Sequence, residues 1–252
     1  MEKIFNIGKN NSIYVKIYNY MEHPKKVMIV CHGFCSSKDS SSVQEITKSF
    51  SKYNIPIIAF DWPAHGQSQD ILSVNKCKET FESIQEYVQK LYPTANKYLY
   101  GSSFGAYIVM LCLCNGSAIN YKCIFFKSPA IKMDKILINS LIEENFEEFE
   151  RNGYTIKKNR GNLIIPYEFY KDLLQNRIDP EKVKNLKNRI LIFHGTNDTI
   201  APIRDVRECV SNRISLTELP GAEHSFKGKY LEQMIDSIIN EFEKNDKIIL
   251  EI

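Results

Sequence analysis

A serine flanked by glycines lies where a predicted strand meets a predicted helix. Residues 98–107 read Tyr-Leu-Tyr-Gly-Ser-Ser-Phe-Gly-Ala-Tyr, which places Ser103 at the centre of a Gly-x-Ser-x-Gly pattern. We predict a tight turn in which Ser103 has a strained backbone and side chains at positions 101 and 105 would collide with neighbouring elements. The turn exposes the hydroxyl at the carboxyl end of the strand, and the helix N-terminus favours negative charge beside it. These are the features of a nucleophile elbow, although an ordinary glycine-rich turn has the same pattern.

The strand before Ser103 is one of several continuous apolar runs that are typical of strands covered on both faces. The other runs occupy residues 27–31, 55–60, 123–126, 189–193 and 215–219. Helical patterns separate them: one ends near residue 53, and the others span 75–91, 202–211 and 229–244. This alternation predicts an α/β fold with a mostly parallel sheet and helices on both faces. Residues 3–7 and 12–20 alternate in polarity, which predicts two antiparallel strands at one edge.

Residues 131–187 depart from this alternation and are rich in charged and aromatic side chains. Their patterns predict a helix over 134–151, a turn at Asn152-Gly153, a hairpin over 154–165 and a helix over 167–176. We therefore expect a small inserted cap at 131–187 on a core formed by residues 1–130 and 188–252.

The composition excludes several classes of function. The 252 residues are 43% hydrophobic and 25% charged, which suits one large globular domain. The net charge of +3 argues against nucleic acid as a partner, and no apolar run reaches membrane-spanning length. Residues 1–8 lack the apolar region of a signal peptide, and the seven cysteines suit buried thiols, so we expect a cytoplasmic protein. Cys112-x-Cys114 has no matching second pair, so no metal site is expected there.

A serine hydroxyl needs an adjacent base to act as a nucleophile, and the base needs a carboxylate to orient it. In a parallel sheet these partners belong in loops at the carboxyl ends of later strands. Asp198 follows the strand at 189–193, and His224 follows the strand at 215–219. We predict that Ser103, Asp198 and His224 form a catalytic triad.

Other roles are open for these side chains. His224 could be a surface histidine. The sole role of Asp198 could be to cap the helix near residue 202, and in that case Asp205 or Asp134 would be the acid of the triad. His32, His194 and His65 suit structural roles in turns beneath the site, and Asp61 suits a residue that ties down its own loop.

Five stretches together resemble the α/β-hydrolase family over nearly the whole chain. They are His32-Gly33-Phe34, Asp61-x-x-x-His65-Gly66-x-Ser68, Gly101-x-Ser103-x-Gly105, His194-Gly195-x-x-Asp198 and His224. Within the family the chain is most similar to small capped ester hydrolases, such as the cinnamoyl/feruloyl esterases and monoacylglycerol lipases. It departs from many relatives at Ser102, where they carry histidine or glutamine, and at Trp62-Pro63-Ala64, where they carry an arginine.

The resemblance implies a role for each site residue. Ser103 would attack an ester carbonyl, His224 would accept its proton and return it to the leaving alcohol, and Asp198 would orient His224. The backbone N–H groups of Phe34 and Phe104 would form the oxyanion hole, and no metal or organic cofactor would be needed. The substrate would be a small-molecule ester.

We expect Phe34, Ser102, Tyr167 and Phe169 to contact the substrate. The segment 161–169 resembles the cap of the cinnamoyl/feruloyl esterases. A purely structural role is the alternative for the aromatic residues of this segment, which would then attach the cap to the core without contacting substrate. They are Tyr154, Tyr167, Phe169 and Tyr170.

These observations predict a serine hydrolase that acts on small to medium carboxylic esters through an acyl-enzyme. A thioesterase or a serine peptidase would use the same triad. A catalytically silent binding protein on this fold is a third hypothesis, but such proteins usually lack a triad member, and none is missing here. The acyl and alcohol groups depend on a pocket that the sequence does not define.

Overall fold

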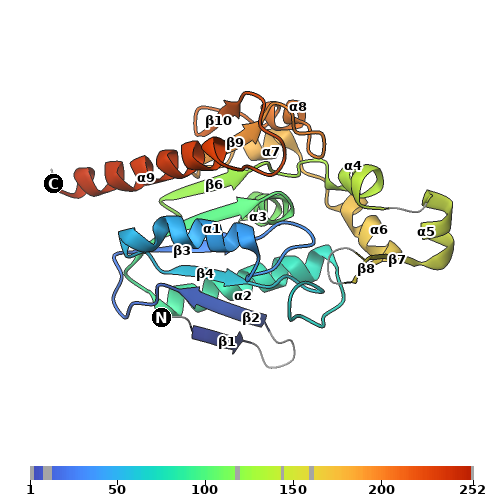
Figure 1. The fold of residues 1–252 in the computed structure, drawn as a ribbon, viewed down its shortest axis with the longest axis horizontal. Coiled ribbons are helices and arrows are strands. Elements are labelled where there is room, and N and C mark those ends of the chain that lie inside the picture. The colour runs from blue at the N-terminus through green and yellow to red at the C-terminus, as the bar shows by residue number, and fades with distance from the viewer. Residues whose placement is uncertain (1–2, 8–12, 117–119, 143–144, 159–161, 251–252) are drawn as a thin grey trace.

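An eight-stranded sheet forms the centre of the computed structural model, which describes residues 3–7, 13–116, 120–142, 145–158 and 162–250 (Figure 1). In spatial order the strands are β1 (Lys3–Ile7), β2 (Ile13–Tyr18), β4 (Ile57–Phe60), β3 (Lys26–Cys31), β5 (Asn96–Ser102), β6 (Cys123–Lys127), β9 (Ile190–Gly195) and β10 (Ile214–Leu219). β2 runs antiparallel to β1 and β4, and the remaining neighbours are parallel. The predicted α/β class and its antiparallel edge are confirmed.

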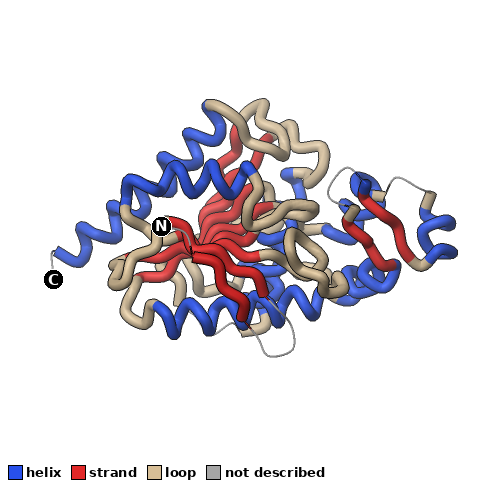
Figure 2. Tube along the Cα trace, turned by 60° about the horizontal axis from the view of Figure 1, so that its bottom comes forward, coloured by secondary structure: helices blue, strands red, loops and turns tan. Residues whose placement is uncertain are grey.

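Helices cover both faces of this sheet, as Figure 2 shows for the central strands. Alternate residues of β3 belong to different apolar layers, because successive side chains of a strand point to opposite faces. One layer contains residues of α1 (Ser41–Phe50) and α9 (Lys229–Leu250), and the other contains residues of α2 (Val74–Leu91) and α3 (Phe104–Cys114). The short helices α7 (Pro180–Lys184) and α8 (Ile203–Arg207) contribute to the second layer. A short 3-10 helix, η1 (Ser51–Tyr53), follows α1.

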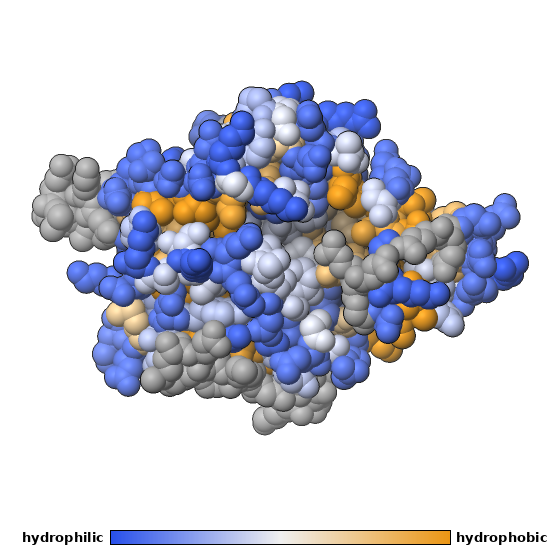
Figure 3. All heavy atoms as spheres, viewed as in Figure 1, coloured by the Kyte–Doolittle hydropathy of each residue, from blue (hydrophilic) through white to orange (hydrophobic). Residues whose placement is uncertain are grey.

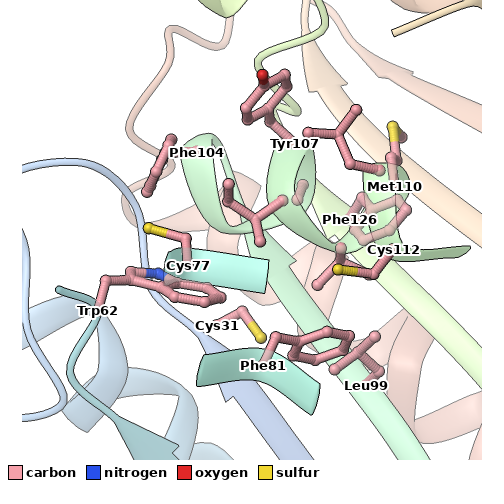
Figure 4. Packing of buried hydrophobic residues seen from close by; sticks show 14 of the residues in the cluster. Cys31, Trp62, Cys77, Phe81, Leu99, Phe104, Tyr107, Met110, Cys112 and Phe126 are labelled. Atoms are coloured by element: carbon pink, nitrogen blue, oxygen red, sulfur yellow. The ribbon is translucent and has the colours of Figure 1, made fainter. Parts of the chain in front are cut away.

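α3 begins directly after Ser103 and is buried from Phe104 to Leu113. Its side chains pack against Trp62, Cys77 and Phe126 in the cluster drawn in Figure 4. Burying a large apolar side chain contributes about 1.5–3 kcal/mol, so the helix is held firmly in the core. The position of Ser103 is therefore fixed by packing on its carboxyl side and by β5 on its amino side.

The chain between β6 and β9 leaves the sheet and forms a separate group of elements. They are α4 (Met133–Ile136), the π-helix η2 (Leu137–Leu141), α5 (Phe146–Asn152), β7 (Tyr154–Lys157), β8 (Leu163–Pro166) and α6 (Tyr167–Gln175). The antiparallel β7–β8 hairpin was predicted, whereas α7 was not. Figure 3 shows apolar surface over this segment, where Phe146, Tyr154, Ile156 and Ile164 are exposed.

The prediction of one helix over 134–151 is wrong. The helical path ends at Leu141, and Ile142 has extended backbone angles. Asn145 then begins a new helix, because its side chain accepts a hydrogen bond from the N–H of Glu148 at 2.8 Å. Within the described residues, no helix combines the length and the apolar character that a membrane span requires.

Candidate active site

Ser103 lies on a strained turn between β5 and α3. Its φ of 51° and ψ of −113° are unusual for a residue with a side chain. Its N–H donates to the carbonyl of Lys127 at 2.9 Å, which ties the turn to β6. A Cβ atom at Gly105 would overlap the carbonyl oxygen of Cys31, and one at Gly101 would lie 3.0 Å from the Cα of Ala106. The glycines therefore permit the close approach of α3 to the sheet.

Ser103, His224 and Asp198 are joined by two hydrogen bonds. The Oγ of Ser103 lies 3.0 Å from the Nε2 of His224, and the Nδ1 of His224 lies 2.8 Å from the Oδ2 of Asp198. The His224 side chain is 17% exposed, whereas that of Asp198 is fully buried. Ser128 steadies the His224 loop by donating from its Oγ to the backbone carbonyl of His224 at 3.3 Å. The structure thus brings together three side chains that are far apart in the sequence.

The Asp198 carboxylate is held from both sides. Its Oδ1 accepts the backbone N–H groups of Ile200 and Ala201 at 3.0 and 2.8 Å. Burial raises the pKa of Asp198, but hydrogen bonds from His194 and His224 outweigh it and hold the pKa below its usual range. Asp198 therefore orients His224 and also anchors its own turn, so the capping interpretation describes part of what this residue does.

The two other candidate acids are engaged elsewhere. Asp205 accepts a hydrogen bond from Lys132 at 2.6 Å, and Asp134 pairs with Arg177 at 2.8 Å. Both carboxylates are occupied by cations rather than by His224, so neither replaces Asp198 in this geometry.

His194 is a second histidine at Asp198, where the sequence pattern predicts only a structural role. It is fully buried, and its Nε2 lies 2.7 Å from the carbonyl of Ala201 and 3.2 Å from the Oδ2 of Asp198. Both partners are acceptors, so Nε2 carries the proton. The contact between His194 and Asp198 could have been predicted from their four-residue spacing in His194-Gly195-x-x-Asp198, which places the two side chains on the same turn.

The backbone N–H groups of Phe34 and Phe104 are available near Ser103. Phe104 is the first residue of α3, so its N–H has no partner within the helix. No hydrogen bond in the described part of the chain uses the N–H of Phe34. A Cβ at the preceding Gly33 would lie 3.5 Å from the Cβ of Ser103, so this loop runs directly beside the serine.

Buried polar contacts hold the loop that contains Phe34. His32 donates from Nδ1 to the carbonyl of Gly33 at 2.8 Å, and its Nε2 accepts the N–H of Trp62 at 3.4 Å. The indole N–H of Trp62 donates to the carbonyl of His32 at 2.9 Å. Burial, together with the nearby His65, lowers the pKa of His32 to about 3, so the ring is neutral. The structural role predicted for His32 agrees with these contacts.

Asp61 ties down its loop as predicted, through Lys38, which belongs to no sequence motif. The Oδ1 of Asp61 accepts the backbone N–H of Lys38, and its Oδ2 accepts the ammonium of Lys38, both at 2.8 Å. Both residues are 1% exposed. The ion pair therefore joins the loop after β3 to the loop after β4 beneath the site.

A pocket of about 310 Å³ opens beside Ser103 and His224. It is lined by Gly33, Phe34, Cys35, Ser36, Ser42, Ser102, Ser103, Lys127, Met133, Ile136, Ser140, Leu141, Lys157, Ile200, His224 and Ser225. In the described part of the chain, no three His, Cys, Asp or Glu side chains are grouped to hold a metal ion.

Of the four residues predicted to contact substrate, this lining contains Phe34 and Ser102 but neither Tyr167 nor Phe169. Phe169 is fully buried and stacks on Phe34 with ring centroids 5.9 Å apart. Tyr167 donates from its hydroxyl to Glu150 at 2.6 Å. These contacts match the alternative in which the aromatic residues attach the inserted segment to the core.

Comparisons with known proteins identify a family and a sequence relative that spans nearly the whole chain. A family model described as serine aminopeptidase, S33, matches residues 22–161. A monoglyceride lipase homologue from monkeypox virus is 23% identical over 268 residues, with 95% of each chain covered.

Solved structures cover nearly the whole chain. Alpha/beta hydrolase domain-containing protein 10 from mouse has a TM-score of 0.72 at 18% identity and covers 97% of this chain and 99% of its own. Est1E from Butyrivibrio proteoclasticus has a TM-score of 0.74 at 16% identity, with coverages of 95% and 98%. The monoacylglycerol lipase of Paleococcus ferrophilus has a TM-score of 0.67 at 18% identity, with coverages of 90% and 97%.

Proposed function

The chain belongs to the serine aminopeptidase S33 family and has the α/β-hydrolase fold, and on this premise we propose that it is a serine hydrolase of small to medium carboxylic esters. The observation that carries the proposal is the continuous hydrogen-bond chain from Ser103 through His224 to Asp198. The names of the viral relative and of the monoacylglycerol lipase support ester cleavage.

In the proposed reaction, the Oγ of Ser103 attacks the ester carbonyl while the Nε2 of His224 accepts its proton. Asp198 stabilises the imidazolium that forms, and His224 then gives the proton to the leaving alcohol. Water hydrolyses the acyl-enzyme with the same residues in the same roles. The N–H groups of Phe34 and Phe104 stabilise the oxyanion, and one such donor typically contributes about a hundred- to a thousand-fold in rate.

The family description raises aminopeptidase activity as a second candidate. An aminopeptidase must hold the positively charged α-amino group of its substrate, for which a carboxylate in the pocket is the usual partner. The described lining of the pocket contains Lys127 and Lys157 and no aspartate or glutamate. The charge of the pocket therefore favours ester over aminopeptide substrates.

We further propose that residues 131–187 act as a cap on a core of residues 1–130 and 188–252. Met133, Ile136 and Lys157 from this segment line the pocket, and Phe169 stacks on Phe34 of the core. We also propose a reducing, cytoplasmic location, since all seven cysteines are free.

A fluorophosphonate probe tests the nucleophile, because it reacts only with an activated serine. We expect the wild-type protein to be labelled, the S103A variant to stay unlabelled, and the S83A variant, altered on α2 outside the pocket lining, to be labelled normally. A folded wild-type protein that resists the probe would favour the silent binding protein. A panel of p-nitrophenyl esters, acyl thioesters and aminoacyl amides then compares esterase, thioesterase and peptidase rates, and fastest cleavage of the amides would reject the proposed substrate class.

A further inference from the structure

Lys127 is the last residue of β6 and lies beside the nucleophile strand. Its carbonyl accepts the N–H of Ser103 at 2.9 Å, and it is in register with Ser102 of β5. Its side chain lines the same pocket as Ser103 and His224. The ammonium lies 5.2 Å from the ring centroid of Phe226, which follows His224 on the next loop. A positive charge is therefore held in the wall of the reaction pocket.

No carboxylate among the described residues is paired with this charge. The Lys127 ammonium makes no ion pair or hydrogen bond with any described residue, although the side chain is only partly exposed. Two other lysines are paired: the more buried Lys38 lies 2.8 Å from Asp61, and the partly exposed Lys132 lies 2.6 Å from Asp205. Burial lowers the pKa of Lys127 to about 8, while the more distant carboxylates Asp198 and Glu45 act in the opposite direction. An unpaired, desolvated ammonium costs stability, so its presence calls for a functional reason.

The rest of the pocket suits an anion on the core side. Ser36, Ser42, Ser102 and Ser225 line it together with Lys127, and all of them belong to the core. None of the described lining residues is acidic. The inserted segment contributes three apolar residues, Met133, Ile136 and Leu141, together with Ser140 and Lys157. The core side therefore combines Lys127 with several serines, whereas the inserted segment presents an apolar patch with Lys157 and Ser140 beside it.

We propose that the preferred ester substrates carry a carboxylate, which Lys127 binds together with the neighbouring serine hydroxyls. This inference rests on the proposed esterase function and narrows its substrate class. Among the described lining residues, the core side supplies one ammonium, which matches the single charge of a carboxylate. The apolar part of such a substrate would lie against the inserted segment. Lys127 is thus assigned as a specificity-determining residue that contacts substrate but takes no part in bond breaking.

The test compares charged and neutral esters of matched size. One pair carries the charge on the acyl side: mono-p-nitrophenyl glutarate and p-nitrophenyl valerate. The other carries it on the alcohol side: 4-acetoxybenzoate and 4-acetoxybenzamide. For the wild-type enzyme we expect kcat/KM to favour the anion in at least one pair by about ten- to a hundred-fold, as for a hydrogen bond to a charged group.

K127M should abolish this preference while neutral esters are still cleaved, and K127R should retain part of it. K122M removes an exposed lysine just before β6 and is the matched control for loss of one positive charge; it should behave as wild type. K127M should unfold close to the wild-type temperature, because it removes a partly buried charge without an ion-pair partner and, with it, the contact with Phe226. Correct folding of this variant is thereby checked in the same experiment.

The outcomes separate the two proposals. If neutral esters are cleaved without any preference for the anion, or if K127M keeps the preference, the role of Lys127 is rejected and the esterase function stands. If inorganic phosphate inhibits the wild type more strongly than glutarate does, and K127M removes that inhibition, the assignment to a carboxylate is rejected. If no ester is cleaved and Ser103 is not labelled by the fluorophosphonate, the esterase function itself fails.

Discussion

The Nε2 of His194 lies 3.2 Å from the Oδ2 of Asp198, the same oxygen that accepts the hydrogen bond from His224. Two imidazole rings therefore share one carboxylate, one buried behind it and one facing the pocket. The buried ring fixes the direction of the carboxylate from behind. His194 is best described as a positioning residue for the proposed triad.

Replacing His194 by glutamine should lower kcat about tenfold, the equivalent of losing one net hydrogen bond of about 1.4 kcal/mol. KM should change little, because His194 does not line the pocket. The matched control is H23Q, which alters an exposed histidine and should leave kcat unchanged. Steady-state kinetics on a p-nitrophenyl ester give both parameters, and a rise in KM at constant kcat would contradict the positioning role.

Asp198→Asn should be much more damaging than the change at His194. The amide cannot stabilise the His224 imidazolium and favours the wrong tautomer, for which a loss of about 10⁴-fold in kcat is typical. The loss should be the same for charged and neutral esters, since the defect lies in proton transfer. D205N is the control for loss of a carboxylate, because Asp205 pairs with Lys132 and does not contact His224. If D205N were more damaging than D198N, the identity of the triad acid would have to be revised.

Stability should fall on acidification because two buried histidines resist protonation. Burial is the main cause that lowers the pKa of His32 to about 3 and that of His65 to about 4. The unfolded chain binds these protons near pH 6.5, so below that pH the unfolded state is favoured increasingly until the folded pKa is reached. Between pH 7 and pH 5 each ring should remove about 2 kcal/mol from the free energy of unfolding.

Urea denaturation at the two pH values measures this loss. In H65N the difference between pH 7 and pH 5 should shrink by about 2 kcal/mol, since asparagine does not titrate there. H23N, at an exposed histidine, should keep the full difference. An unchanged difference in H65N would mean that His65 becomes protonated in the folded protein.

The buried pair of Lys38 and Asp61 should be a major determinant of stability. Asp61→Ala leaves the Lys38 ammonium in the interior, which costs about 3–5 kcal/mol for a buried pair. We expect the lower end, because Asp39 remains 3.0 Å from the same ammonium. E168A breaks the exposed pair of Lys171 and Glu168 and should cost less than about 1 kcal/mol. Comparable losses in the two variants, measured by urea denaturation, would refute the importance of the buried pair.

The preference for anionic esters should weaken above pH 8. Lys127 is positively charged below its pKa of about 8 and loses its proton above it, so carboxylate binding declines as pH rises. The carboxylates of Asp198 and Glu45 act against this loss, because negative charges favour the protonated form of Lys127. Two other ionisable side chains, His224 and Lys157, also line the pocket. The ratio of kcat/KM for a matched charged and neutral pair cancels effects of His224 on chemistry. A ratio that stays constant from pH 7 to pH 9.5 would argue against Lys127 as the charge that is sensed.

Sequence patterns were sufficient to predict most of the sheet and the elements around Ser103. Apolar runs identify the central strands because both faces are covered, and loops at the carboxyl ends of parallel strands converge, which made Asp198 and His224 candidates. The break after Leu141 escaped prediction because the helical apolar spacing continues across it.

Contacts between distant segments were not predictable in the same way. Lys38 reads as one of many scattered lysines until the fold places it against Asp61, and Lys127 reads as the end of an apolar strand. Their significance depends on burial and on the presence or absence of a counterion. Neither property is encoded by local spacing, so these two residues emerge only from the three-dimensional structure.

The stacking of Phe34 on Phe169 has a consequence for engineering. Phe34 supplies a main-chain donor next to Ser103, and its ring contacts Phe104 as well as Phe169 of α6. A chimera that received residues 131–187 from another enzyme would exchange one wall of this aromatic stack. Grafts that retain an aromatic ring at position 169 should preserve turnover, whereas grafts with a small residue there would loosen the donor loop as well as alter selectivity.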